Sequence, residues 1–157
     1  MTSDVVVRTA GLTKRYGRTE ALHAVDLELR RGEVVGYLGP NGAGKTTTLR
    51  ILMGFIRATD GVATVLGLDA WRDAHLVHRR VGYLPGEPAL PDRLTGRQQV
   101  RFTARLRGQD NDKRAVAVAE RLDLDLDRPA KALSKGNRQK LAVALAFLSD
   151  PALLILD

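Results

Sequence analysis

The sequence of 157 residues contains no cysteine. This absence excludes a disulfide framework and any metal or iron–sulfur site built on thiolates. Long apolar runs are missing as well, since the longest covers residues 141–148 and a membrane-spanning helix needs roughly 20 apolar residues. The start of the chain has no basic segment followed by an apolar one, so no signal peptide is visible. We therefore expect a cytoplasmic type of chain.

Aromatic residues are also scarce, at 4% of the chain, which leaves little for stacking against nucleic-acid bases. Charge, in contrast, is unbalanced: 25 lysines and arginines face 18 acidic residues, for a net charge of +7. Such an excess favours a phosphate-bearing partner, which can be nucleic acid, a nucleotide or an anionic membrane surface. With so few aromatic residues, we expect no nucleic acid among the partners.

Short strand-like runs alternate with helical stretches, a pattern typical of α/β proteins. The expected strands cover residues 5–8, 24–29, 33–38, 61–66, 81–84 and 153–157. The expected helices cover residues 46–53, 71–80, 95–107 and 111–122, and a last one that opens within residues 133–137. The segment 33–38 is mostly apolar and suits the centre of a sheet, whereas 61–66 reads as an edge strand. Residues 85–91 are rich in turn formers, and the two helices after them indicate a helical insertion.

Residues 39–46 match the pattern G-x-x-x-x-G-K-[ST] of a phosphate-binding loop. Glycines let backbone N–H groups turn inward and approach a triphosphate closely. Lys45 adds a positive charge for the β- and γ-phosphates, and the Thr46 hydroxyl can join the shell of a Mg²⁺ ion. The helix that follows contributes its N-terminal partial charge. The motif therefore predicts a site for a nucleoside triphosphate with Mg²⁺.

Three motifs in order make the chain similar to the ATP-binding subunits of ABC transporters. The loop with its second threonine, Thr47, is typical of ABC-type ATPases, residues 133–137 resemble the signature Leu-Ser-Gly-Gly-Gln, and residues 153–157 resemble a Walker B strand. Residues 81–85 and 94–96 look like the exporter branch that serves ABC-2-like permeases. The resemblance implies an α/β P-loop core with an N-terminal antiparallel β portion and an inserted helical subdomain.

The same resemblance divides the chain and assigns its site. It implies a β portion with P-loop core in residues 1–84, a Q-loop region with helical subdomain in 85–130, and the signature helix with Walker B strand in 131–157, the C-terminal remainder of the domain being absent. ATP would contact Tyr16, Gly39, Pro40, Asn41, Gly42, Ala43, Gly44, Lys45, Thr46, Thr47, Ser134, Gly136 and Asn137. Tyr16 would stack on adenine, and Ser134, Gly136 and Asn137 would begin a helix that meets the γ-phosphate held by the opposite subunit. Mg²⁺ would be held by Thr46 and Asp157, and catalysis would use Lys45 and Asp157.

The sequence departs from the family pattern at several positions. Where the Q-loop glutamine is expected the chain has Gly86, followed by Glu87. Glu87 either replaces that glutamine in catalysis or belongs to a turn, and both interpretations stay open. Lys135 and Asn137 replace the commoner glycine and glutamine of the signature. The glutamate and the switch histidine that the family places after the Walker B aspartate have no counterpart, because Asp157 is the last residue.

As a whole, the resemblance implies an ATP-binding subunit that couples ATP hydrolysis to transport, with export the favoured direction, through a separate transmembrane permease. It also implies a homodimer or heterodimer with ATP between the subunits, on the inner face of the cell membrane. Two alternatives stay open: a soluble ABC-type ATPase not linked to transport, and a nucleotide-binding fragment without turnover. Arg93, Arg97, Arg101 and Arg105 recur every four residues, so the last three stack on one face of the helix at 95–107. This face is either solvated or a contact for the permease or anionic headgroups.

Overall fold

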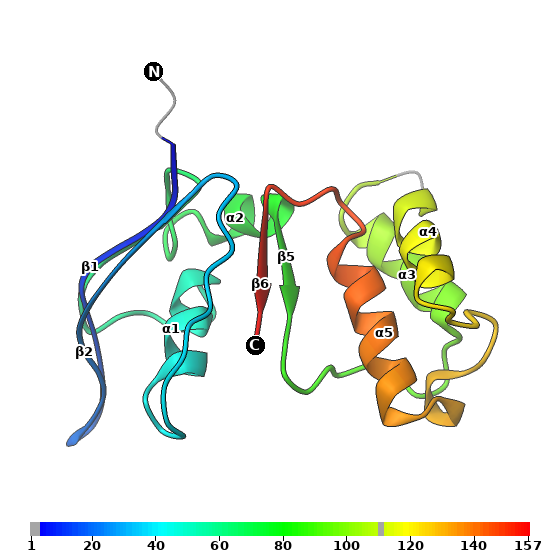
Figure 1. The fold of residues 1–157 in the computed structure, drawn as a ribbon, viewed down its shortest axis with the longest axis horizontal. Coiled ribbons are helices and arrows are strands. Elements are labelled where there is room, and N and C mark those ends of the chain that lie inside the picture. Colours follow the sequence, from blue (N-terminus) through cyan, green and yellow to red (C-terminus); the bar gives the residue numbers. More distant parts are fainter. Residues whose placement is uncertain (1–3, 110–111) are drawn as a thin grey trace. The chain divides into compact units, whose positions relative to one another are not determined.

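The computed structural model describes residues 4–109 and 112–157, which form two compact units, Met1–His78 and Arg79–Asp157. Each unit is described by itself below, and Figure 1 traces the elements of both. The expected helix at 111–122 begins with Asn111, a position that lies outside the described residues.

The first unit is built on an antiparallel sheet with the strand order β2-β1-β3-β4. Its elements are β1 (Val5–Tyr16), β2 (Thr19–Arg30), α1 (Lys45–Leu52), β3 (Asp60–Val65), β4 (Leu68–Asp69) and α2 (Ala74–Arg80). Figure 1 shows β1 and β2 as one long hairpin, with α1 beside it. Leu12, Leu22 and Ile51 form the buried core between this hairpin and α1.

The hairpin is much longer than the sequence pattern predicts. Its strands meet at a two-residue turn that starts with Gly17, whose φ of 58° suits glycine in a tight hairpin connection. Two buried threonines, Thr9 and Thr13, interrupt the apolar alternation of β1, and for this reason the sequence pattern predicts only its first part. The Thr9 hydroxyl donates to the carbonyl of Val25 at 2.9 Å, and the Thr13 hydroxyl accepts from the backbone N–H of Ala24 at 3.0 Å. Each buried hydroxyl is compensated by a hydrogen bond. A hydropathy pattern does not include such hydrogen bonds, so it does not predict that these polar residues are buried in a strand.

Two strand predictions in this unit were wrong. Residues 33–38 form no strand, and Val34 and Leu38 are 100% and 89% exposed. An apolar run becomes a strand only when a neighbouring strand supplies hydrogen bonds, and none of the strands that the structure describes pairs with this segment. The strand at 61–66 exists as β3, but it lies inside the sheet, because the short β4 pairs along its outer side.

The second unit joins a small parallel sheet to a group of helices. Its elements are β5 (Val81–Leu84), α3 (Gly96–Leu106), α4 (Lys113–Arg121), the 3₁₀ turn η1 (Ala130–Ala132), α5 (Lys135–Ala146) and β6 (Leu153–Leu156). Strands β5 and β6 pair in parallel, with Val81 opposite Leu153. The three helices lie against one another around a core that includes Val100, Ala115 and Leu141. These elements confirm the predicted helices and strands of this region to within a few residues.

Candidate nucleotide-binding site

The phosphate loop is held in shape by two glycines in left-handed conformation. Gly42 and Gly44 both have a φ of 83°. A Cβ at Gly44 would lie 2.4 Å from the backbone oxygen of Ala21 and 2.5 Å from the side chain of Leu22. A Cβ at Gly42 would meet nothing within 4 Å. Gly44 is therefore required both by its backbone angle and by close packing against β2, whereas Gly42 is required by its angle alone.

Lys45 folds back over the loop at the start of α1. Its Nζ donates to the carbonyl oxygens of Gly39 and Pro40, at 2.7 and 2.8 Å. The ammonium group therefore lies inside the turn of the loop, where it has a third proton to donate. No side chain caps the N-terminus of α1, since its N-cap residue is Gly44. The positive end of the helix and the ammonium charge thus meet in the same loop.

The loop encloses a pocket of about 300 Å³. Its lining consists of Ala21, Asn41, Gly42, Gly44, Lys45, Thr46 and Thr47. Of the remaining predicted loop residues, Gly39 and Pro40 supply the carbonyls that hold Lys45, and Ala43 donates its backbone N–H to Pro40 at 3.2 Å. These groups suit a polyphosphate with Mg²⁺. The phosphates require a cation and N–H donors, which the ammonium group and the glycine-rich backbone provide, and Mg²⁺ requires an oxygen ligand, which a threonine hydroxyl provides.

Thr48 and Tyr37 support the loop and were not predicted from the sequence. Thr48 is fully buried, and its hydroxyl donates to the carbonyl of Gly44 at 3.2 Å. The Tyr37 hydroxyl lies 3.2 Å from the same threonine oxygen. These contacts tie α1 to the segment that precedes the loop. The one available signal was the third threonine in a row after Lys45, which the motif does not require.

Tyr16 lies at the tip of the hairpin and is not among the residues that line the loop pocket. Its ring is half exposed, and the Lys14 ammonium lies 4.9 Å from the ring centroid. Next to it, Arg15 donates to the Glu20 carboxylate at 2.9 Å and thereby lowers the pKa of Glu20. The tip thus carries an exposed aromatic ring with one ammonium group close to it.

The signature residues form the start of α5, as the sequence predicts. Ser134 is the N-cap residue, and its hydroxyl accepts from the backbone N–H of Asn137 at 3.2 Å. Gly136 lies in the exposed first turn, where an added Cβ would meet nothing within 4 Å. The turn is therefore open to a ligand or partner. Lys135, which stands where the family signature commonly has glycine, lies in this turn and leaves the Ser134 cap unchanged.

Asp157 follows directly after β6, beside the position where the family has its Q-loop glutamine. The backbone N–H of Asp157 donates to the carbonyl of Leu84 at 2.9 Å, which continues the pairing of β5 and β6. A Cβ on Gly86 would lie 3.5 Å from the backbone oxygen of Asp157. Glu87 is exposed in the bend after β5. The structure thus places Gly86 next to Asp157, and it leaves both interpretations of Glu87 open.

Part of the arginine row on α3 pairs with acids of its own unit. Arg97 donates from Nε to the Asp127 carboxylate at 2.8 Å, and Arg101 lies 3.6 Å from Asp112. The guanidinium of Arg97 lowers the pKa of Asp127. All of these side chains are at least partly exposed, so the pairs are screened by water.

Comparison with known proteins identifies the family. The sequence profile of the ABC transporter family matches residues 22–157. The chain therefore belongs to the ABC transporter family, of which it represents the ATP-binding domain. The chain is 41% identical over 156 residues to the daunorubicin resistance ATP-binding protein DrrA2 of Streptomyces coeruleorubidus, with 96% of this chain and 48% of that protein covered. It is 31% identical over 159 residues to the bacitracin transport ATP-binding protein BcrA of Enterococcus faecalis, with 100% and 52% covered.

Solved structures show the same fold. One described as the ATP-binding subunit of an ABC transporter superposes with a TM-score of 0.87 at 29% identity, and the match covers 97% of this chain and 65% of that one. The dimeric ABC transporter cassette MJ0796 superposes with a TM-score of 0.86 at 24% identity over 96% and 73% of the two chains. The fold is that of an ABC ATPase cassette, and the chain spans about half the length of the two relatives named above.

The residues that the structure describes include no helix both long and apolar enough to cross a bilayer.

Proposed function

We propose that the phosphate loop binds ATP with Mg²⁺ and that the chain is the ATP-binding part of an exporter. The observation that carries the proposal is the loop pocket, where the Lys45 ammonium, the threonines at the start of α1 and glycine-rich backbone line one space. This donor set suits a triphosphate better than a neutral or cationic ligand. Family membership supports the same ligand.

Within this site, each residue has a distinct task. Lys45 exchanges its bonds to the loop carbonyls for bonds to the β- and γ-phosphates, and the glycine backbone supplies N–H donors around them. Thr46 and Asp157 would hold Mg²⁺, which supplies charge neutralisation at the phosphates when it is bound. Tyr16 offers its exposed ring to adenine. Glu87 is the candidate to replace the missing Q-loop glutamine.

We further propose an assembly around two nucleotides. The open first turn of α5, with Ser134, Gly136 and Asn137, would contact the γ-phosphate bound by a second ATP-binding subunit. A transmembrane permease would hold this dimer at the inner face of the membrane, with residues 85–130 as the helical subdomain that meets it. The names of two relatives, daunorubicin resistance and bacitracin transport, favour a drug-like exported substrate.

Calorimetric titration of Mg–ATP tests this function. The variant Lys45→Ala should lower the affinity about a hundredfold, because it removes charge-assisted hydrogen bonds to the phosphates. The control Lys131→Ala removes the same charge from an exposed position in η1 and should leave the affinity unchanged. Equal affinity of the Lys45→Ala protein would refute the loop as the ATP site.

A further inference from the structure

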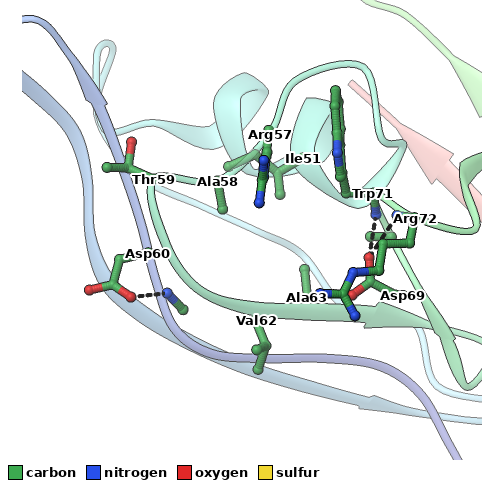
Figure 2. Close-up of a pocket in the computed structure, with 12 residues that line it drawn as sticks. Ile51, Arg57, Ala58, Thr59, Asp60, Val62, Ala63, Asp69, Trp71 and Arg72 are labelled. Atoms are coloured by element: carbon green, nitrogen blue, oxygen red, sulfur yellow. Dashed lines mark hydrogen bonds between the residues drawn. The ribbon is translucent and has the colours of Figure 1, made fainter.

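The first unit contains a second, larger pocket of about 500 Å³. It lies between the end of α1 and the segment that runs from residue 57 through β3 to residue 72, and none of its lining residues belongs to the phosphate-loop pocket. Figure 2 shows ten of its side chains labelled; those that matter here are Arg57, Ala63, Asp69, Trp71 and Arg72, with Ile51 of α1 behind them. Its volume is in the range of small-molecule sites.

Trp71, the one tryptophan of the chain, forms part of the wall and is 46% exposed. The backbone around it is fixed by Asp69, whose Oδ1 accepts from the N–H groups of Trp71 and Arg72 at 2.9 and 2.8 Å. The backbone N–H of Asp69 in turn donates to the Asp73 carboxylate at 3.1 Å. This double turn holds a large apolar ring half in water, where it is available to stack on another planar group.

Two guanidinium groups accompany the ring. Figure 2 shows Arg57 and Arg72 directed toward the middle of the pocket from two different segments. Among the described residues, neither guanidinium forms an ion pair with a carboxylate. The pocket does contain acids, but Asp69 is engaged by backbone N–H groups, and Asp60 accepts from the N–H of Gly61 at 2.8 Å. The donors of both arginines therefore remain for a ligand.

We propose that this pocket binds a small planar aromatic carboxylate. The ring would stack on Trp71 over the apolar floor of Ile51 and Ala63, and the carboxylate would receive paired N–H donors from Arg57 and Arg72. Planar guanidinium groups favour a carboxylate over a neutral amide of the same shape, so charge as well as shape is selected. This inference does not rest on the proposed nucleotide function, because the two pockets share no lining residue.

A titration followed by ¹H–¹⁵N NMR tests the proposal directly. The single tryptophan provides one indole N–H signal, which reports on this wall of the pocket. The probe is 2-naphthoate, and 2-naphthamide is the neutral control of the same shape. We expect naphthoate to shift the indole signal in a saturable way, with an affinity about tenfold or more above that of naphthamide, as charge-assisted bonds predict. Equal shifts from both compounds would overturn the proposal.

Three variants locate the carboxylate. Arg57→Gln and Arg72→Gln should each weaken naphthoate binding about tenfold. The control Arg31→Gln removes an exposed arginine from the turn after β2, outside the pocket, and should leave binding unchanged. The remaining backbone signals of each variant report whether it is folded. If the Arg57→Gln and Arg72→Gln proteins are folded and bind naphthoate as tightly as the unaltered chain, the pocket is not a carboxylate site.

Discussion

The helix starts of the two units are stabilised in different ways. In the first unit, α1 begins at a left-handed glycine, has no side-chain cap, and is preceded by a loop whose carbonyls hold Lys45. In the second unit, Ser134 caps α5, and Thr95 caps α3 through a reciprocal pair of bonds with Gln98. A side chain that caps a helix occupies donors that an anion would otherwise use. The contrast shows that the start of α1 has no side-chain cap of its own and depends on the loop before it, whereas the starts of α3 and α5 are each stabilised by a side chain.

The largest effect should come from Gly44→Ala in the loop before α1. The new Cβ would clash with Ala21 and Leu22 and would hold an unfavourable backbone angle, so we expect a loss of about 3 kcal/mol in the free energy of unfolding. The matched variant Gly42→Ala has the same angle without the clash and should cost only about 1 kcal/mol. Urea unfolding followed by circular dichroism measures both. Equal losses would show that packing against β2 does not hold this helix start in place.

A smaller effect is expected at the start of α5. Ser134→Ala removes the hydrogen bond to the backbone N–H of Asn137 and should lower the free energy of unfolding by about 1 kcal/mol. Ser134→Gly should cost only a few tenths, roughly 0.3 kcal/mol, because water reaches the freed N–H group and glycine suits an N-cap. Urea unfolding again gives the values. If Ser134→Ala is as stable as the unaltered chain, the serine cap does not stabilise this helix start.

The smallest effect concerns the first turn of α3, where Arg97 is a cation near the positive end of a helix and is compensated by Asp127. The pair lowers the pKa of Asp127 in the folded chain. Its contribution to stability is therefore present above the ordinary carboxyl pKa of about 3.9 and is lost as the pH falls through the lower, folded value.

The variant Arg97→Gln should return the pKa of Asp127 to its ordinary range, which an NMR titration of the carboxyl carbon measures. It should also make the stability difference from the unaltered chain smaller at acid pH than at neutral pH. A pKa of Asp127 that stays low in the variant would show that Arg97 is not the group that lowers it.

Much of the second unit could be predicted from sequence because its elements have short-range causes. The helix at 95–107, the helix start at Ser134 and the turn formers of 85–91 all have causes within a few residues. The phosphate loop was predictable for the same reason, since its glycines and Lys45 form one contiguous pattern.

Features that depend on distant partners escaped the sequence analysis. The buried hydroxyls of Thr9 and Thr13 are satisfied by β2, so the polar residues of β1 hid the length of the hairpin. The run 33–38 has the composition of a strand, but none of the strands in the described part of the chain pairs with it. Thr48 and Tyr37 support the loop through contacts that no local motif encodes.

The run 33–38, which pairs with none of the strands that the structure describes, has a consequence for how the protein behaves at high concentration. Its backbone groups and the exposed side chains of Val34 and Leu38 form a stretch with which an extended segment of another copy can pair by backbone hydrogen bonds. Association of this kind rises with concentration and is slowed by charge on the stretch. The variant Val34→Lys, which adds a charge to this stretch, should therefore lower association at high concentration.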